Sequence, residues 1–333
     1  MMRVRDRAVT IFAAGNRGGC RLLKMEKFKA RKIIGSSLKR VIYPQHLWRV
    51  VKLQRGRKRV RQAHNDLQLK LYSEILPGDF LHYGYFDDPQ IQPQDISLND
   101  IHLAQLRYAE LILEKIVDRS SPVLDVGCGM GGLIKLMLDR GLSPVALSPD
   151  KNQIRYIKSK YEQVPAIESK FEQIPCEEHM NRYGTIITAE SLNYLKLDTA
   201  LPLMEKLLKP GGRWIACDFF RIVEAKKRSE HWGDFERRIS QSGLRFVHQQ
   251  DITLNVLPTI SYVYMWGNDI ALPVLNFFLE NMRAKQPGVH YMLEEVIEMI
   301  NKRAEIHLEV VNPDTFAANK KYMLLVLEKK STD

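Results

Sequence analysis

The sequence that decides the fold is Pro-Val-Leu-Asp-Val-Gly-Cys-Gly-Met-Gly-Gly, residues 122–132. Residues 122–126 are apolar apart from one acid and predict a buried strand, and the glycines predict a tight loop that opens a helix over about 132–140. Glycine lets the backbone approach a ligand closely, and the first turn of a helix offers free N–H groups. This combination predicts a nucleotide-binding site.

The acid in this stretch indicates which nucleotide is bound. By its letters the loop from Gly127 to Gly132 also fits the dinucleotide pattern Gly-x-Gly-x-x-Gly. Asp125 lies two positions before the first glycine, where a carboxylate would repel a pyrophosphate and accommodate an ammonium group. The sequence therefore favours a cofactor with an amino-acid tail, and an NAD-binding or catalytically silent Rossmann-like protein stays open as an alternative.

Residues 123–129, Val-Leu-Asp-Val-Gly-Cys-Gly, resemble the first signature of class I S-adenosylmethionine-dependent methyltransferases. Residues 207–212, Leu-Leu-Lys-Pro-Gly-Gly, look like the turn before the fifth strand in that family. The resemblance covers about residues 100–252 and the last strand. It implies an α/β, Rossmann-like sheet of seven strands with helices on both faces, and S-adenosylmethionine as the cofactor.

The same resemblance implies a set of cofactor-binding residues. The loop 127–131 would line the methionine part, with Asp125 nearby. The next strand ends Val-Ala-Leu-Ser at 145–148, without the usual acid for the ribose, as in cyclopropane-fatty-acid-synthase-like members, and residues 170–175 depart from the family's adenine-contacting segment. The candidates are Asp125, Gly127, Cys128, Gly129, Gly131, Ser148, Gln153, Phe171, Glu172, Ala189, Tyr83 and Tyr85.

Residues 189–195, Ala-Glu-Ser-Leu-Asn-Tyr-Leu, follow the fourth expected strand, where the family places side chains beside the transferring methyl. The cofactor already activates this methyl, so the protein has to hold an acceptor in line with it and in some cases take a proton. Glu190 and Tyr194 are the catalytic candidates, Glu190 as the group that orients or deprotonates the acceptor. An equally good interpretation is that Glu190 caps the following helix.

Residues 79–86, Asp-Phe-Leu-His-Tyr-Gly-Tyr-Phe, concentrate aromatic side chains before the domain. They are similar to Tyr-Gly-rich segments that lie over the cofactor in lipid and isoprenoid methyltransferases. Tyr83 and Tyr85 are expected on the sulfonium side. Phe80 and Phe86 are expected to form an apolar plug under the N-terminal helix, and a structural role is expected for His82.

From residue 97 on, expected strands and helices alternate, which predicts a mostly parallel sheet covered on both faces. Helices are expected at about 100–118, 132–140, 149–160, 198–208 and 232–242, and strands at 122–126, 144–147, 166–168, 183–189, 213–219, 245–251 and 321–329. Pro149 is expected in the first turn of its helix. Residues 209–212 are expected to form a turn.

Charge divides the chain, because residues 1–62 hold 19 Lys and Arg against 2 acids, whereas the rest holds 31 against 37. Residues 1–24 are expected to be disordered or a non-native start. Residues 25–96 are expected to form a basic helical arm and cofactor lid, and 97–333 the methyltransferase domain. The arm at 25–62 would either lie on an anionic membrane surface or cap the enzyme in solvent.

Residues 255–318 form a helix-rich, aromatic insertion before the last strand and are expected to be a lid over the acceptor. Its aromatic and Met side chains include Tyr262, Tyr264, Met265, Trp266, Phe277, Phe278 and Met282. Such residues at helical spacing are also typical of a core. An apolar acceptor is inferred from this surplus of apolar surface.

The sequence thus predicts methyl transfer from S-adenosylmethionine to a small, apolar organic or lipid-like acceptor. The strand ending at Ser148 and the basic arm keep open methylene addition to a lipid, as in cyclopropane synthases. Four widely spaced cysteines indicate no metal site, and the arm lacks the aromatic interleaving typical of nucleic-acid binding. No apolar run approaches the ~20 residues of a membrane span, so a cytoplasmic protein is expected, with peripheral contact at the inner membrane surface through the arm.

Overall fold

The computed structural model describes residues 45, 48, 78–224 and 229–330. The expected disordered start at 1–24 lies outside the described residues, as does the arm at 25–62 except for Gln45 and Trp48. From residue 78 on, the described chain belongs to one compact unit. The segment before the expected domain start at 97 therefore packs as part of this unit.

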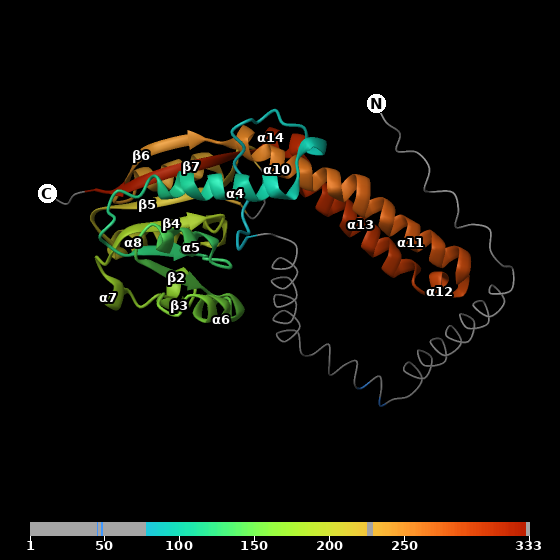
Figure 1. The fold of residues 1–333 in the computed structure, drawn as a ribbon, viewed down its shortest axis with the longest axis horizontal. Helices are drawn as coiled ribbons and strands as arrows, with labels where there is room; N and C mark the ends of the chain where they lie inside the picture. The colour runs from blue at the N-terminus through green and yellow to red at the C-terminus, as the bar shows by residue number, and fades with distance from the viewer. Residues whose placement is uncertain (1–44, 46–47, 49–77, 225–228, 331–333) are drawn as a thin grey trace, which may run out of the picture. The chain divides into compact units, whose positions relative to one another are not determined.

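A seven-stranded sheet organises the domain, with the order β3-β2-β1-β4-β5-β7-β6 (Figure 1). The strands are β1 Val123–Val126, β2 Pro144–Ser148, β3 Ala166–Glu168, β4 Tyr183–Ala189, β5 Leu208–Arg221, β6 Leu244–Asp251 and β7 Lys320–Lys329. The pairs from β3 to β5 are parallel, and β7 runs antiparallel to both β5 and β6. The predicted Rossmann-like sheet is confirmed.

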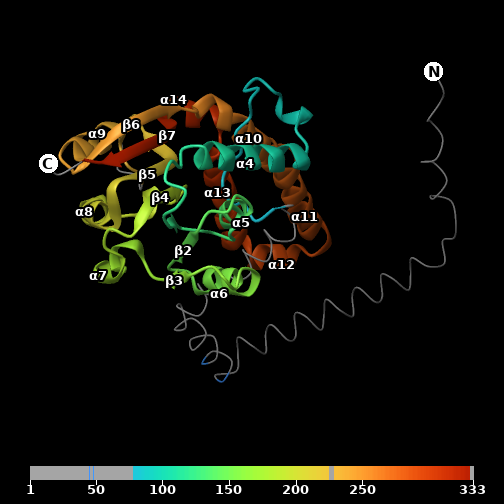
Figure 2. The same ribbon diagram turned by 60° about the vertical axis from the view of Figure 1, so that its left-hand side comes forward.

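Helices cover both faces of this sheet (Figure 2). The helices before the insertion are α4 Leu98–Leu113, α5 Gly132–Asp139, α6 Lys151–Lys160, α7 Cys176–His179, α8 Leu197–Leu207 and α9 Trp232–Ser240, with 3-10 turns η1 Pro93–Asp95, η2 Phe171–Gln173 and η3 Leu192–Tyr194. Successive strand residues point to opposite faces. Val123 accordingly joins the core under α4, α5 and α6, whereas Leu124 joins the core under α8 and α9.

Three expected boundaries were wrong. Helix α4 begins at a Ser97 capping box and ends at Leu113 rather than at 118, because Asp118 accepts hydrogen bonds from Ser120 and Ser121 in a turn. Pro149 does not enter α6, since Asp150 is the N-cap and accepts from the backbone of Asn152.

The third concerns residues 209–212, which lie within β5 instead of forming a separate turn before it. The pairing of β4 with β5 shifts register between Tyr183 and Thr185, and Gly211 has φ +69°. The extra backbone is accommodated as an irregularity in the strand.

The insertion is helical, as expected. It consists of α10 Thr253–Met265, the π-helix η4 Trp266–Ala271, α11 Leu272–Lys285, α12 Pro287–Met292, α13 Glu294–Val310 and α14 Pro313–Asn319. Figures 1 and 2 show α11 and α13 side by side and antiparallel, joined by α12. A Cβ on Gly267 would lie 2.5 Å from Cδ2 of Leu308, so η4 packs directly on α13. We call α11, α12 and α13 the helical hairpin.

We expect Trp214→Ala to lower the free energy of unfolding by about 3–5 kcal/mol, because this fully buried indole fills the core and its Nε1–H donates to Thr188 Oγ1 at 2.9 Å. Chemical denaturation measures the change. Trp266→Ala is the matched control: its side chain is 46% exposed, and the expected loss is below about 1 kcal/mol. Equal losses in the two variants would contradict this description of the core.

Candidate active site

The loop after β1, residues 127–131, has glycine at three of its five positions. Gly127 has φ +82° and Gly131 has φ +86°, in the left-handed region that favours glycine. A Cβ on Gly127 would also lie 2.6 Å from Cβ of Ser191. This loop leads into the N-terminus of α5, so its backbone can come within contact distance of a ligand.

Neighbouring strands hold the loop in position. The backbone N–H of Gly127 donates to the Leu147 carbonyl at 2.8 Å, and Ser191 Oγ donates to the Val126 carbonyl at 2.5 Å. Residues from β2 and from the segment after β4 thereby meet the loop at the carboxyl ends of the central strands. Ligands of open α/β sheets bind at this edge.

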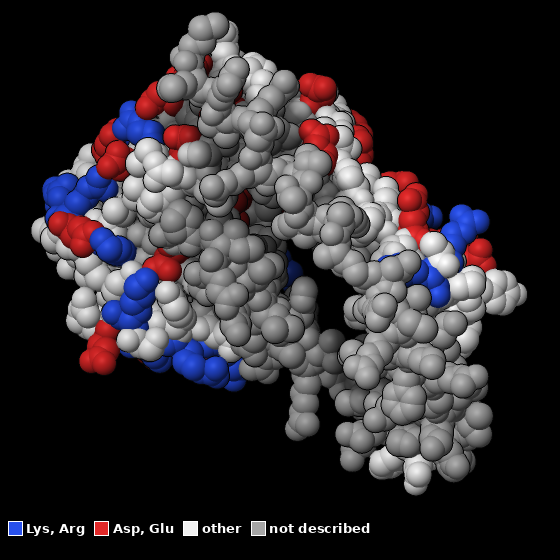
Figure 3. Space-filling model, turned by 45° about the vertical axis from the view of Figure 1, so that its right-hand side comes forward, with Lys and Arg blue, Asp and Glu red and all other residues white. Residues whose placement is uncertain are grey.

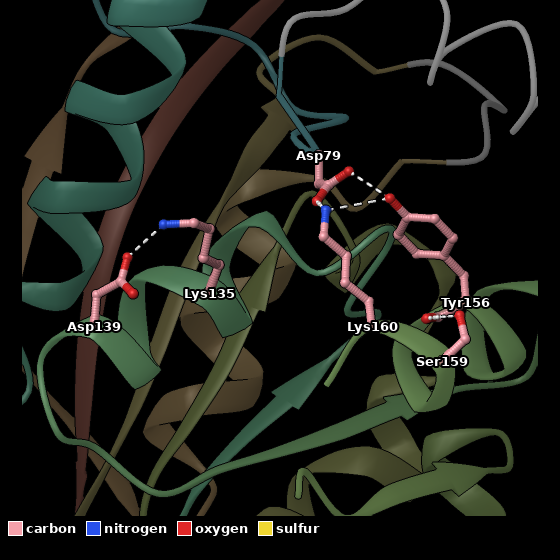
Figure 4. Close-up of polar contacts among 6 residues, drawn as sticks. All are labelled: Asp79, Lys135, Asp139, Tyr156, Ser159 and Lys160. Atoms are coloured by element: carbon pink, nitrogen blue, oxygen red, sulfur yellow. Dashed lines mark hydrogen bonds and ion pairs between the residues drawn. The ribbon is translucent and has the colours of Figure 1, made fainter. Parts of the chain in front are cut away.

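The segment 78–86 lies against the same loop, and we call it the strap. Its start is fixed on α6, because Asp79 accepts a hydrogen bond from Tyr156 and pairs with Lys160 (Figure 4). Phe80 packs so closely on Gly132 that a Cβ there would meet its ring at 2.5 Å.

The rest of the strap is held by α4 and α10. Gly84 N–H donates to Thr259 Oγ1 at 3.0 Å, and Phe86 N–H donates to the Asn255 carbonyl at 2.9 Å. Phe80 and Phe86 are both buried, and the N-terminal helix that they were expected to underlie is outside the described residues. His82 stacks on Tyr108 with a centroid distance of 4.2 Å, and burial lowers its pKa to about 4, so it is a neutral packing residue as expected.

Asp125 is a buried carboxylate beneath the loop. Its Oδ2 has no hydrogen-bond partner among the described residues, and burial raises its pKa to about 7. An orphaned buried carboxylate is costly unless a cation or a bound water satisfies it. This fits a cofactor whose ammonium group approaches the carboxylate directly or through water.

The other candidates for the cofactor differ in their surroundings. Ser148 Oγ at the end of β2 donates to Gln153 Oε1 of α6 at 2.6 Å, so these two candidates lie in contact. Phe171 is fully buried in the core below the sheet edge. Glu172 accepts from the backbone of Lys196 at 2.8 Å, which ties it to the start of α8.

Glu190 follows β4 and does not cap a helix. It has the unusual φ of +53° for a residue other than glycine, and such local strain is found where surrounding structure imposes it. Its Oε1 accepts from Tyr83 N–H and from Tyr322 O–H, both at 2.8 Å. Burial raises the pKa of Glu190 to about 7, while these two hydrogen bonds oppose the rise and Asp218 adds to it. A carboxyl with this pKa can exchange a proton near neutrality.

A chain of tyrosines continues from Glu190 into the core. Tyr322 Oη lies 3.0 Å from Tyr108 Oη, which donates to the Cys217 carbonyl at 3.1 Å. Because Tyr108 uses its proton on that carbonyl, Tyr322 donates to Glu190 when the carboxylate is ionised. When Glu190 is protonated it can donate to Tyr322, which then donates to Tyr108. The network therefore accommodates both protonation states.

The sequence did not single out Tyr108, Tyr322, Asn193 or Asp218. Asp218 is 1% exposed and accepts from Asn193 Nδ2 at 2.8 Å, and burial raises its pKa to about 6. An acid inside the apolar strand at 213–221 was a visible signal for it. Nothing in the pattern of β7 distinguished Tyr322 from an ordinary core tyrosine.

The remaining candidate site residues differ in their exposure and in their neighbours. Tyr194 is 86% exposed on η3. Tyr83 is partly buried and meets the ring of Tyr322 edge-on at 6.2 Å, and Tyr85 is partly buried against the core. Ala189 ends β4 beside Cys217 of β5. Cys128 is buried within the loop.

A family model and a relative of known sequence both match part of this chain. Residues 124–216 match the family model described as a methyltransferase domain. An uncharacterized methyltransferase of Mycobacterium tuberculosis is 30% identical over 91 residues, which make up 27% of this chain and 37% of that protein. The chain thus matches little more than a third of that relative's length.

Solved structures share the fold over most of the chain. The [4+2]-cyclase SpnF superposes with a TM-score of 0.55 at 16% identity, covering 80% of this chain and 94% of the cyclase. A geranyl diphosphate methyltransferase in complex with GPP and sinefungin gives 0.55 at 15%, with coverages of 79% and 93%. The cyclopropane synthase MmaA2 from Mycobacterium tuberculosis gives 0.53 at 15%, with 75% and 90%. The chain thus shares its fold with these structures, and residues 124–216 match a methyltransferase domain.

We expect Tyr322→Phe to raise the pKa of Glu190 by about one unit, because the ionised carboxylate loses a hydrogen bond that is stronger than the one lost by the neutral form. Tyr108→Phe should lower the pKa of Glu190. Tyr322 donates to Tyr108 only when Glu190 is protonated, so this variant destabilises the protonated form alone. Titration of ¹³C-labelled glutamate by NMR, with the resonance assigned by Glu190→Gln, measures both. Shifts of the same sign would contradict the proton arrangement.

Proposed function

We propose that the protein transfers a methyl group from S-adenosylmethionine to a small, apolar organic or lipid-like acceptor. The observation that carries the proposal is the glycine loop at 127–131 above the buried Asp125, whose Oδ2 has no hydrogen-bond partner among the described residues. The proposed place of action is the cytoplasm, with the arm at 25–62 as a contact to the inner membrane surface.

The residues around the loop would hold the cofactor. The loop backbone and Asp125 would receive the amino-acid tail, and the pair Ser148 and Gln153 would face the ribose side at the end of β2. When bound, S-adenosylmethionine supplies a methyl group that its sulfonium already activates. The chain's own task is then to position the acceptor and exclude water.

Glu190 is the proposed base at the acceptor. It lies at the carboxyl edge of β4, next to the strap and directly before Ser191, whose Oγ donates to the Val126 carbonyl. Burial raises its pKa to about 7, which indicates surroundings of low polarity and suits an apolar acceptor. In this proposal Glu190 orients the acceptor and takes up the proton that leaves it, and Tyr322 keeps the carboxylate aimed.

Methylene addition to an alkene is the second candidate reaction. It also ends with the loss of a proton, so the buried position and raised pKa of Glu190 suit it equally. The products differ in one bond, because a methylated product formed by proton loss retains a double bond whereas a cyclopropane does not. Mass spectrometry of products after double-bond derivatisation separates the two reactions.

Gly127→Ala is expected to weaken S-adenosylhomocysteine binding at least tenfold in calorimetry, because the new Cβ would meet Ser191 at 2.6 Å and displace the loop. Gly211→Ala is the matched control, since Gly211 also has a positive φ, +69°, but has nothing within 4 Å of the added Cβ. It should bind as the unaltered protein does. Absence of binding by the unaltered protein would rule out the proposed function.

Cells that produce the protein and receive deuterated methionine should accumulate labelled lipids or metabolites that are absent from cells without it. Glu190→Gln should reduce this labelling about 10²–10⁴-fold while S-adenosylhomocysteine binding is kept. Glu205→Gln is the control, because this partly buried carboxylate also accepts a backbone hydrogen bond, from Gly243 at 2.8 Å, but lies on α8. Equal labelling by both variants would show that Glu190 takes no part in the methyl transfer.

A further inference from the structure

The helical hairpin exposes large apolar side chains along both of its long helices. On α11 Phe277 is 63% exposed and Phe278 61%, and on α13 Ile306 is 53% exposed. Together with Val274, Val296 and Met299, these residues form what we call the apolar face. Contiguous apolar patches are rarely left open on soluble monomers, and they mark binding surfaces.

The two stripes of this face lie on the same side of the hairpin. The better-buried positions between the helices are Leu275, Leu279, Ile297, Ala304 and Leu308. At 100° per residue, the exposed apolar positions lie roughly 140° around each helix from these positions, in the same rotational sense. Helices α11 and α13 run antiparallel (Figures 1 and 2). An equal offset on two antiparallel helices turns both stripes toward one side.

The acids of α11 and α13 are kept off the apolar face by the same geometry. Lys285 and Arg303 fall on the side of the apolar face, and Glu295 and Lys302 fall at its edge. The opposite side carries acids, among them Glu280 and Glu298, together with Arg283. Figure 3 shows acidic and basic side chains interspersed over the described part of that view. An apolar surface with basic residues beside it and no acid on it can lie in an anionic membrane interface.

Two other partners that could cover the apolar face, a second copy of the chain and its own segment 25–62, fit its charge less well. A second copy in a two-fold interface would place the same face on itself and bring Lys285 and Arg303 together with their counterparts. The chain's own segment 25–62 carries 13 Lys and Arg against one acid, so its charge would be repelled by the same two residues. Anionic lipid headgroups offer the complementary charge, and acyl chains offer the apolar environment.

We propose that the apolar face of the helical hairpin binds the surface of an anionic lipid bilayer, with Phe277 and Phe278 inserted at the boundary between headgroups and acyl chains. The hairpin lies in the interface, and no described helix is long and apolar enough to cross a bilayer. This contact is independent of the proposed methyl transfer, and it would bring a lipid-like acceptor to the domain.

Co-sedimentation of the full chain with vesicles of phosphatidylcholine and phosphatidylglycerol tests the proposal. Phe277→Ser/Phe278→Ser should lower the partition coefficient at least tenfold, in low salt and in about 1 M salt, where attraction between basic segments and lipid is screened. The matched control is Leu103→Ser/Val117→Ser, two side chains 53% and 58% exposed on the sheet domain. It should bind as the unaltered protein does, and thermal melting confirms that both variants fold.

A second measurement locates the contact. Phe277→Trp should give fluorescence that brominated lipids quench, whereas Val117→Trp should add no quenched signal above that of the native tryptophans. Equal vesicle binding by the Phe277→Ser/Phe278→Ser variant and the unaltered protein would overturn the proposal. A change from dimer to monomer in that variant, with vesicle binding unchanged, would assign the face to a second copy instead.

Discussion

The structure depends on keeping two carboxyl groups at the carboxyl edge of the sheet without a cationic partner among the described residues. Asp125 in β1 and Glu190 after β4 both have a pKa raised by burial to about 7. Such groups destabilise the fold when they ionise, so the protein needs compensating interactions around them. Glu190 has them in the Tyr83 and Tyr322 hydrogen bonds, whereas Asp125 Oδ2 has none. Asp125 is therefore available to a ligand, whereas Glu190 is already positioned by the protein.

The strap and the insertion complete this edge from outside the sheet. The strap reaches Glu190 through the backbone of Tyr83, and its later residues hydrogen-bond Asn255 and Thr259 of α10. Helix α10 continues through η4 into the helical hairpin. A force applied to the hairpin by a bound surface would therefore act on an element that contacts the strap. This continuity links the apolar face to the site through packed helices and hydrogen bonds.

The shared fold does not by itself decide the reaction. A [4+2]-cyclase and a geranyl diphosphate methyltransferase superpose on this chain with the same TM-score of 0.55. Reaction type lies in the residues at the sheet edge, where loops of different sequence meet a common cofactor cradle. In the proposed function those residues are a carboxyl with a raised pKa, its tyrosine partners and aromatic side chains of the strap. The low polarity of their surroundings is the reason for proposing an apolar acceptor.

The sequence by itself determined the succession of strands and helices along the chain, the glycine loop and the buried acid before it. These features depend on local patterns of apolar residues and on the conformations that glycine allows. It placed β3 and β4 at their observed bounds and named Asp125 and Glu190. It missed the end of α4, where side-chain bonds of Asp118 compete with the helix. Only the tertiary structure brought Tyr322, 132 residues away in sequence, onto Glu190 and turned two apolar stripes to one side of a hairpin. Contacts of that kind arise from strand pairing and helix packing, which no local pattern specifies.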